Sequence, residues 1–401
     1  MSRILLAWEL GTGFGHIGPF LTVATGLLKR GHELHIAARE VAGAVAAVGD
    51  LPIAVHQAPL CLNTYGGFQD PPLYYAEILM RYGYLEPAML HGLLTAWRSL
   101  MRVVRADIVM ADHAPTALLA ARDLGLPRAV IGSPFNVPPA VAPTQNMRDW
   151  ETVPAGRLAD SDARVLKVIN VARSDAQPLA ALHCIFEGAV HFFSGIPELD
   201  PYGARPADDY LGLRAVSAGS AEPSWPEGDG QRVFAYLHAP YPHLERALQA
   251  LASSGARVLV HLLGGNPALM RKYEGGRMHF APALLDFDKV VSACDLCVCH
   301  GNVGTTLGML QAGRPLLMLP MHLEHFLLGR SVARAGAGEC VHPDAAEPDI
   351  AGTLTRMLAD PQYRKAAEGL AAREAATSVG TITHRAIARI EAFAAQAKDR
   401  T

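Results

Sequence analysis

The sequence has little net charge and no long apolar run, and both absences exclude classes of protein. Its 35 lysines and arginines stand against 38 aspartates and glutamates, a formal net charge of −3, so we expect no nucleic-acid partner. The apolar stretch at residues 4–8 ends at Glu9, too soon for a signal peptide. No later segment has the ~18 uninterrupted apolar residues of a membrane span. We therefore expect a cytoplasmic protein without an integral membrane segment.

Cysteine is also scarce, with six residues in a chain of 401. This number does not suggest a disulfide framework in so long a chain. Cys294, Cys297 and Cys299 are followed by His300, but a zinc site would need a second ligand cluster at a recognisable spacing. Cysteine also packs as a small hydrophobic residue. We therefore interpret this stretch as a buried strand and expect neither a metal nor a cofactor.

Short apolar runs that alternate with amphipathic segments dominate both halves of the sequence. Strands are predicted at 3–9, 33–38, 53–56, 107–111, 128–132 and 190–193, and again at 232–237, 257–263, 277–280, 296–300 and 315–319. Helical spacing of apolar residues separates most of them. This alternation is typical of parallel sheets covered on both faces. The predicted fold class is α/β, with two Rossmann-like doubly wound domains facing a cleft, where such folds bind ligands.

Composition suggests where the domains begin and end. Residues 204–230 are rich in Gly, Ala, Ser, Pro and Asp, which is typical of a linker. We therefore expect a first domain at 1–203, a linker at 204–230, a second domain at 231–380, and a final helix at 381–401 that packs back on the first domain. Two irregular segments, 59–87 and 133–156, interrupt the first domain, and long irregular segments are usually functional.

A glycine-containing turn follows the predicted strand that ends at His300. Gly301, Asn302, Val303, Gly304 and Thr305 open the predicted helix 303–312. A helix N-terminus presents unpaired N–H groups and the positive end of the helix dipole, which suits a phosphate. A His300 ring N–H and the Thr305 hydroxyl could add donors. The turn is therefore a candidate phosphate site.

Residues 294–338 resemble the donor-binding motif of inverting nucleotide-sugar glycosyltransferases of the GT-B fold, the family that includes UDP-glucosyl- and UDP-glucuronosyltransferases. The residues that match the motif in register are His300, Gly301, Gly304, Thr305, Gly313, Pro315 and Pro320. The resemblance implies a donor site formed by His300, Gly301, Asn302, Val303, Gly304, Thr305, Glu324 and His325, together with Gly13 and Gly15 of the first half.

The sequence departs from the family motif at three places. Asn302 stands where the family has a second glycine, and Gly308 stands where it has the glutamate that holds the ribose. Glu324 and His325 replace the Asp-Gln pair that holds sugar hydroxyls. The resemblance therefore implies an intact phosphate site and leaves the base and the sugar open, with UDP and dTDP both acceptable.

The first half carries a matching signature, residues 15–19, with sequence Gly-His-Ile-Gly-Pro. In the family this histidine is the general base, so the resemblance implies that role for His16, whose side chain titrates near neutral pH. It also implies a carboxylate that orients the ring, for which Asp112 is the candidate. Asp112 could instead cap the following helix, and Asp107 begins the same strand. Glu9 has no counterpart in the family and could be held by turn amides or contact a ligand.

In the family, variable loops of the first domain form the acceptor site. The corresponding aromatic candidates are Tyr65, Phe68, Tyr74 and Phe135. They imply a flat or apolar acceptor, either a small molecule or a lipid-linked one. The alternative is that these aromatic residues fill the core beneath the loops.

The resemblance implies that the chain transfers a sugar from a UDP or dTDP donor to an acceptor hydroxyl with inversion. Two alternatives share the fold: a nucleotide-sugar 2-epimerase, and a non-catalytic relative that binds a nucleotide or a partner. His16 argues against the non-catalytic relative, because a protein without chemistry needs no base at that position.

Overall fold

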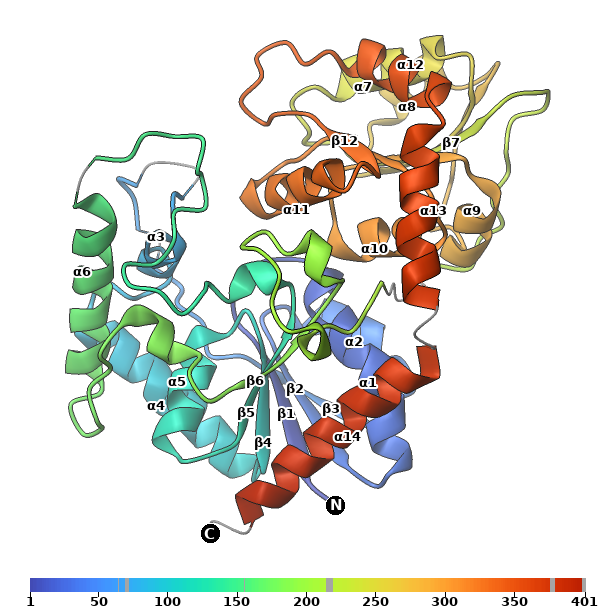
Figure 1. Cartoon of the computed structure of the whole chain (residues 1–401). Helices are drawn as coiled ribbons and strands as arrows, with labels where there is room; N and C mark the ends of the chain where they lie inside the picture. Colours follow the sequence, from blue (N-terminus) through green and yellow to red (C-terminus); the bar gives the residue numbers. More distant parts are fainter. Residues whose placement is uncertain (64, 69–71, 155, 214–218, 376–378, 399–401) are drawn as a thin grey trace. The chain divides into compact units, whose positions relative to one another are not determined.

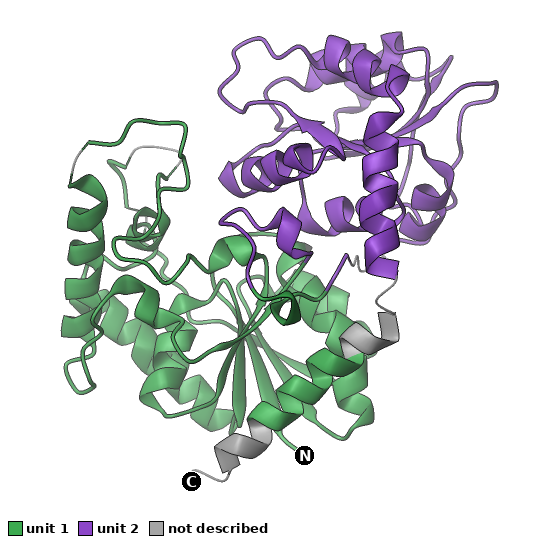
Figure 2. Cartoon of the chain, viewed as in Figure 1, with its two compact units in different colours: residues 1–194, 206–211, 380–401 green, residues 195–205, 212–379 purple. Residues whose placement is uncertain are grey.

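The computed structural model describes the whole chain except residues 64, 69–71, 155, 214–218, 376–378 and 399–401. It consists of two compact units (Figure 2): unit 1 comprises residues 1–194, 206–211 and 380–401, and unit 2 comprises residues 195–205 and 212–379. This division differs from the single linker expected at 204–230. The chain enters unit 2 at residue 195, returns to unit 1 for six residues, and enters unit 2 again at residue 212.

Unit 1 is built on a six-stranded parallel sheet of order β3-β2-β1-β4-β5-β6 (Figure 1). Its strands are β1 (Arg3–Trp8), β2 (Glu33–Ala38), β3 (Ile53–Gln57), β4 (Ile108–Asp112), β5 (Arg128–Gly132) and β6 (Val190–Phe193). Its helices are α1 (Gly18–Lys29), α2 (Val41–Val48), α3 (Tyr75–Met80), α4 (Pro87–Val103), α5 (Pro115–Asp123), α6 (Arg157–Ala172) and α14 (Val379–Lys398). This strand order is that of the Rossmann fold.

The C-terminal helix α14 packs on unit 1. Its buried residues Ala386, Ile387 and Ile390 share a core cluster with residues of β1, β2, β4 and α1. A Cβ added at Gly26 of α1 would lie 2.3 Å from Ile387 Cδ1. The glycine therefore lets the two helices approach closely.

Unit 2 repeats the same architecture, with strand order β12-β11-β10-β7-β8-β9 and all strands parallel. Its strands are β7 (Arg232–His238), β8 (Arg257–Leu263), β9 (Met278–Phe280), β10 (Leu296–Cys299), β11 (Leu316–Met318) and β12 (Gly338–Cys340). Its helices are α7 (Leu244–Ser253), α8 (Pro267–Tyr273), α9 (Phe287–Ala293), α10 (Val303–Gln311), α11 (Leu323–Arg334), α12 (Ile350–Ala359) and α13 (Gln362–Ala375). Cys294, Cys297 and Cys299 are buried and unpaired within its core.

Each sheet has one point where the strand order reverses direction. In unit 1 this switch point lies between the adjacent strands β1 and β4, and in unit 2 between β7 and β10. Ligands of doubly wound folds bind beyond the carboxyl ends of the strands at such points. His16 and Asp112 follow or end the two strands in unit 1, and His238 and His300 do so in unit 2.

The segment 59–87, expected to be irregular, contains the helix α3. Tyr74, Tyr75 and Tyr84 of this segment are fully buried, and the Tyr84 hydroxyl lies 2.8 Å from Thr116 Oγ1 of α5. Much of the segment is thus part of the core of unit 1. Within the described part of the chain, no helix has the length and apolar character needed to cross a bilayer.

Candidate functional site

A histidine–aspartate pair lies at the switch point of unit 1. His16 ends a short 3-10 helix, η1 (Phe14–His16), and its Nδ1 lies 2.9 Å from Oδ1 of Asp112, the last residue of β4. Both side chains are buried, and the Asn136 amide donates to the same carboxylate oxygen at 3.3 Å. A carboxylate at Nδ1 favours the tautomer with the proton on Nδ1. Nε2 then carries the lone pair that can accept a proton.

The two competing interpretations of this pair do not hold. Helix α5 begins after Ala114 with no side-chain capping bond, so Asp112 is not its cap. Asp107, the other carboxylate of the strand region, accepts the Arg3 backbone N–H at 2.7 Å. Asp112 is therefore the carboxylate that contacts His16.

Two glycines that the motif comparison missed lie directly against the pair. Gly11 and Gly132 have φ angles of +79° and +109°. A Cβ at Gly11 would lie 2.2 Å from His16 Nε2, and a Cβ at Gly132 would lie 2.2 Å from Asp112 Oδ2. Both positions therefore need glycine for the backbone conformation and for space. The sequence signal was a glycine in the turn after the first predicted strand and another at the end of the predicted strand 128–132.

Aromatic rings surround His16. Trp8 stacks on its ring with 5.2 Å between centroids, and His113 lies 6.3 Å away. Phe135 contacts the His113 ring edge-on at 6.5 Å. Burial, and then the charge of His16, lower the pKa of His113 to about 3. His113 is thus a neutral ring beside the pair.

The four residues expected to bind the acceptor fall into two groups. Tyr74 is completely buried, with its hydroxyl 2.8 Å from Ser161 Oγ, and Phe135 is only 6% exposed. The acceptor role expected for Tyr74 is wrong for this structure, because its ring fills the core beneath the loops. Tyr65 and Phe68 are half-buried, and the Arg81 guanidinium lies 4.9 Å from the Phe68 ring centroid.

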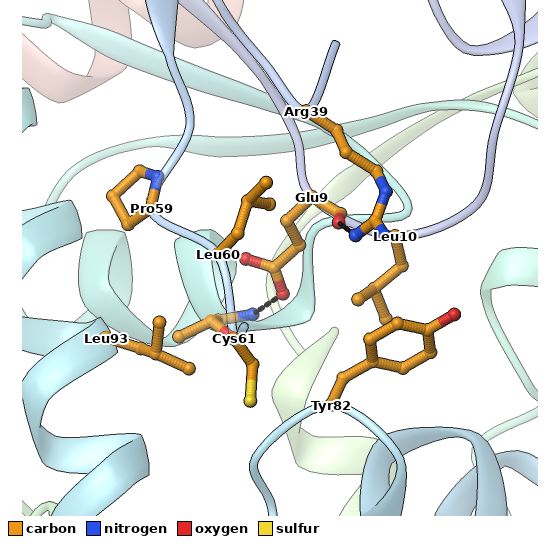
Figure 3. A pocket seen from close by; sticks show the side chains of 9 residues that line it. Glu9, Leu10, Arg39, Pro59, Leu60, Cys61, Tyr82 and Leu93 are labelled. Carbon is orange, nitrogen blue, oxygen red and sulfur yellow. Dashed lines mark hydrogen bonds between the residues drawn. The ribbon is translucent and has the colours of Figure 1, made fainter. Parts of the chain in front are cut away.

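Glu9 lies at the end of β1, in a small pocket of unit 1 (Figure 3). The pocket is lined by Glu9, Leu10, Arg39, Pro59, Leu60, Cys61, Tyr82, Leu93 and Thr116. It offers about 10 Å³ to the centre of a water-sized group, enough for about one water molecule. Glu9 Oε1 accepts the Thr116 backbone N–H at 2.8 Å, and Arg39 donates to the Glu9 carbonyl rather than to its carboxylate. The N-terminus of α5, rather than a turn, therefore supplies the amide that holds Glu9.

Burial raises the pKa of Glu9 from its usual 4.5 to about 7, although hydrogen bonds from Thr116 act in the opposite direction. Between these pH values the folded protein keeps a proton that the unfolded chain releases. The stability from this group is complete below pH 4.5 and is lost as the pH rises through 7.

We expect the free energy of unfolding of the wild type to fall by about 2–3 kcal/mol more than that of Glu9→Gln between pH 5 and pH 8. Glutamine keeps an oxygen for the Thr116 N–H but does not ionise. Urea unfolding at both pH values measures the difference. Glu40→Gln, at an exposed position before α2, controls for the loss of a carboxylate. Parallel pH dependence of wild type and Glu9→Gln would show that Glu9 keeps its usual pKa.

In unit 2, the turn after β10 opens α10 as predicted. Gly301 has a φ of +95°, and a Cβ there would lie 2.9 Å from the His325 carbonyl oxygen. Asn302 precedes the first helical residue and makes no side-chain capping bond. The N–H groups of the first turn of a helix have no acceptor within the helix. The first turn, with Gly304 exposed and Val303 and Thr305 half-buried, therefore offers N–H groups of the kind that an anion site uses, and its phosphate role stays a prediction.

The structure changes the role expected for His300. Its ring is fully buried, its Nδ1 lies 2.7 Å from the Leu319 carbonyl oxygen, and its Nε2 accepts the His238 backbone N–H at 2.8 Å. Burial lowers the pKa of His300 to about 4, so the ring is neutral. The expected donation of a His300 ring N–H to phosphate is wrong in this structure, because both ring nitrogens are already engaged. His300 instead fixes the turn to β7 and β11.

The remaining donor candidates lie where the sequence places them, but their roles stay predictions. Glu324 is half-buried in the first turn of α11, His325 is 8% exposed, and Gly308 is buried within α10. Gly13 and Gly15 are exposed in the turn before α1.

Comparison with known proteins agrees with these features. Residues 248–387 match the family model "Erythromycin biosynthesis protein CIII-like, C-terminal domain". The chain is 22% identical over a 410-residue alignment to a PGL/p-HBAD biosynthesis glycosyltransferase of Mycobacterium tuberculosis, covering 92% of this chain and 88% of the relative. It is 41% identical over 83 residues, 20% of each chain, to the elloramycin glycosyltransferase ElmGT of Streptomyces olivaceus.

Solved structures share the fold along nearly the whole chain. The calicheamicin glycosyltransferase CalG4 has a TM-score of 0.69 at 19% identity, covering 98% of both chains. The glycosyltransferase VinC, in complex with dTDP, has a TM-score of 0.66 at 16% identity, covering 98% of this chain and all of VinC. The sequence matches and the shared fold confirm the resemblance carried by the motifs: the chain is a nucleotide-sugar-dependent glycosyltransferase of the GT-B fold.

Proposed function

We propose that the protein transfers a sugar from a dTDP- or UDP-sugar to a hydroxyl of an apolar or aromatic acceptor, with inversion at the anomeric carbon and with His16 as the general base. The observation that carries this proposal is the buried hydrogen bond between His16 Nδ1 and Asp112 Oδ1. A base oriented by a carboxylate is what deprotonation of a hydroxyl requires. A 2-epimerase has no acceptor hydroxyl to activate, so the pair favours transfer.

In the proposed step, His16 Nε2 takes the acceptor proton while the acceptor oxygen forms a bond to the anomeric carbon. The bond from that carbon to the diphosphate oxygen breaks, and its electron pair leaves with the diphosphate. Attack from the face opposite the leaving group inverts the configuration. Asp112 stabilises the imidazolium that forms. We assign the leaving diphosphate to the N-terminus of α10, because the free N–H groups and the dipole of this helix favour negative charge.

The acceptor class rests on the loops of unit 1. Leu62 is 86% exposed and Val141 is 47% exposed, and Tyr65 and Phe68 are half-buried in the same loop as Leu62. Apolar side chains left in water favour contact with an apolar molecule. We infer a small aromatic or lipid-linked acceptor from this surface. The six cysteines, all unpaired, support a reducing compartment such as the cytoplasm.

The direct test is incubation of the protein with dTDP-glucose or UDP-glucose and a panel of phenolic acceptors. We expect acceptor-dependent release of nucleoside diphosphate, and a product whose anomeric configuration, read by NMR, is opposite to that of the donor. A product that retains the donor configuration would contradict inversion. Conversion of the donor to its 2-epimer without an acceptor would contradict transfer.

The proposal includes that the ribose 2′-hydroxyl contributes little to binding of the donor nucleotide. A carboxylate that holds a ribose hydroxyl contributes roughly 1.5–3 kcal/mol, and the residue at that motif position is Gly308. The structure of VinC contains dTDP, a deoxyribonucleotide, and this supports dTDP as a donor nucleotide here.

We expect UDP and dUDP to bind with dissociation constants within a factor of ten of each other in isothermal titration. The two ligands differ only at the 2′-hydroxyl, so each serves as the control for the other. Tighter binding of UDP by tenfold or more, about 1.4 kcal/mol, would show that the hydroxyl is read and that another group replaces the missing carboxylate.

A further inference from the structure

Histidines gather around the phosphate-binding turn of unit 2 in a way that the family motif does not account for. His238 ends β7, and its ring centroid lies 5.1 Å from that of His300. His322 precedes α11, and its ring centroid lies 3.5 Å from that of His325. His325 also lies against the turn, since a Cβ added at Gly301 would be 3.2 Å from the Cβ of His325. We call His238, His322 and His325 the histidine cluster.

Two ring nitrogens, one of His238 and one of His325, lack a hydrogen-bond partner among the described residues. His238 Nε2 and His325 Nδ1 are buried and accept or donate no hydrogen bond among the described residues, and the His325 side chain as a whole is only 8% exposed. Buried polar atoms without a partner are costly and call for an explanation. No group of three or more histidine, cysteine, aspartate or glutamate side chains in the described part of the chain could hold a metal ion. If protonated, either ring could donate a hydrogen bond to an anion at the neighbouring turn.

The surroundings of His238 and His325 disfavour the protonated forms of these two rings when no ligand is bound. The titratable groups beside the cluster are Tyr236 of β7, His261 of β8, and Glu324, which precedes His325 in α11; His300 lies against His238, and Tyr241 lies against His300. Burial, and then the charges of His322, His300 and His238, hold the pKa of His325 well below its usual range. Burial, and then the charges of His261 and His322, lower the pKa of His238.

Helix dipoles act in the same direction. His322 and His325 lie at the N-terminus of α11, where a positive charge is unfavourable. A diphosphate at the neighbouring turn would bring two or more negative charges close to these rings. A nearby opposite charge favours the protonated imidazole. Since both nitrogens of His300 are engaged with Leu319 and His238, the added protons go to the cluster rather than to His300.

Building on the proposed function, we propose that a nucleoside diphosphate binds unit 2 with uptake of about one proton, which is shared among His238, His322 and His325, so that the protonated imidazole donates to the diphosphate. The positive charge of the cluster thus increases when the ligand arrives. By reciprocity, the affinity for the diphosphate falls as the pH rises.

The test is isothermal titration of dTDP into the full chain at pH 7.5, in two buffers of different ionisation enthalpy. The difference between the two enthalpies gives the number of protons taken up. For the wild type we expect uptake of about one proton. This uptake should lower the affinity for dTDP by about tenfold from pH 7 to pH 8. We expect His322→Gln and the double variant with His325→Gln to take up less than half as many protons.

Three controls make the result decisive. His279→Gln removes a histidine of β9, the strand at the edge of the sheet, and should leave the proton count unchanged. Thymidine, which has no phosphate, should bind without uptake. The exposed His322 provides a variant that is expected to fold, as a melting curve can verify. If dTDP binds but the proton count is zero or the same in all variants, this inference is overturned and the proposed function stands. If neither dTDP nor UDP binds at all, the proposed function itself fails.

Discussion

His16→Ala is expected to lower the turnover number by ~10²–10⁴-fold and to leave the affinity for nucleoside diphosphate nearly unchanged. The buried ring is held by Asp112 at 2.9 Å and stacks on Trp8. Its loss therefore removes the only proposed base without touching the α10 turn of unit 2. Steady-state kinetics with saturating donor, combined with titration of dTDP, separates the two effects.

His35→Ala is the matched control for this variant. His35 is also buried in unit 1 and also hydrogen-bonded, to His56 at 3.1 Å, but it lies in β2, away from the β1–α1 turn. Its removal should cost stability without a comparable loss of turnover. Turnover that survives in His16→Ala would mean that another group takes the acceptor proton.

The sequence could predict the parts of the site that depend on local pattern. Continuous apolar runs locate β1 and β10 to within one residue, at 3–9 and 296–300 against Arg3–Trp8 and Leu296–Cys299. Once the strands are placed, the glycine turns that follow them bring His16 and the α10 N-terminus to the carboxyl ends of the sheets. This is a consequence of parallel topology, so it needs no knowledge of tertiary packing.

Packing between distant segments decided what the sequence could not predict. The aromatic ring of Tyr74 is buried because its hydroxyl reaches Ser161 of α6, 87 residues along the chain. Both ring nitrogens of His300 have hydrogen-bond partners because backbone groups of His238 and Leu319 reach the ring. Helix α13 was not predicted; its buried residues are Ala367 and Leu370, too few for a recognisable apolar stripe.

Both units place histidines at the carboxyl ends of the strands that flank their switch point, but the groups around these histidines differ in charge. In unit 1, His16 contacts a carboxylate, which stabilises its protonated form. In unit 2, burial lowers the pKa values of His238 and His325, and the charges of neighbouring imidazoles lower them further. A base must be able to hold a proton that it takes from the acceptor, whereas the histidine cluster gains its charge only with an anion. The two environments therefore suit the two proposed roles.

Gly11→Ala is expected to lower turnover by ~10²-fold, the effect of displacing a catalytic group by about 1 Å. The added methyl group would lie 2.2 Å from His16 Nε2, the nitrogen proposed to take the proton, so the ring has to move. The φ of +79° at this position adds roughly 1–2 kcal/mol of strain for any residue other than glycine. Thermal unfolding and steady-state kinetics measure the two effects separately.

Gly31→Ala isolates the steric effect from the strain. Gly31 has nearly the same φ, +80°, but a Cβ there meets no atom within 4 Å. Gly31→Ala should therefore lose stability through strain alone, Gly11→Ala should lose at least as much, and only Gly11→Ala should lose turnover, with dTDP affinity unchanged in each. Equal turnover in the two variants would mean that the space beside His16 Nε2 has no part in the reaction. His16 would then not be the base, although it contacts Asp112.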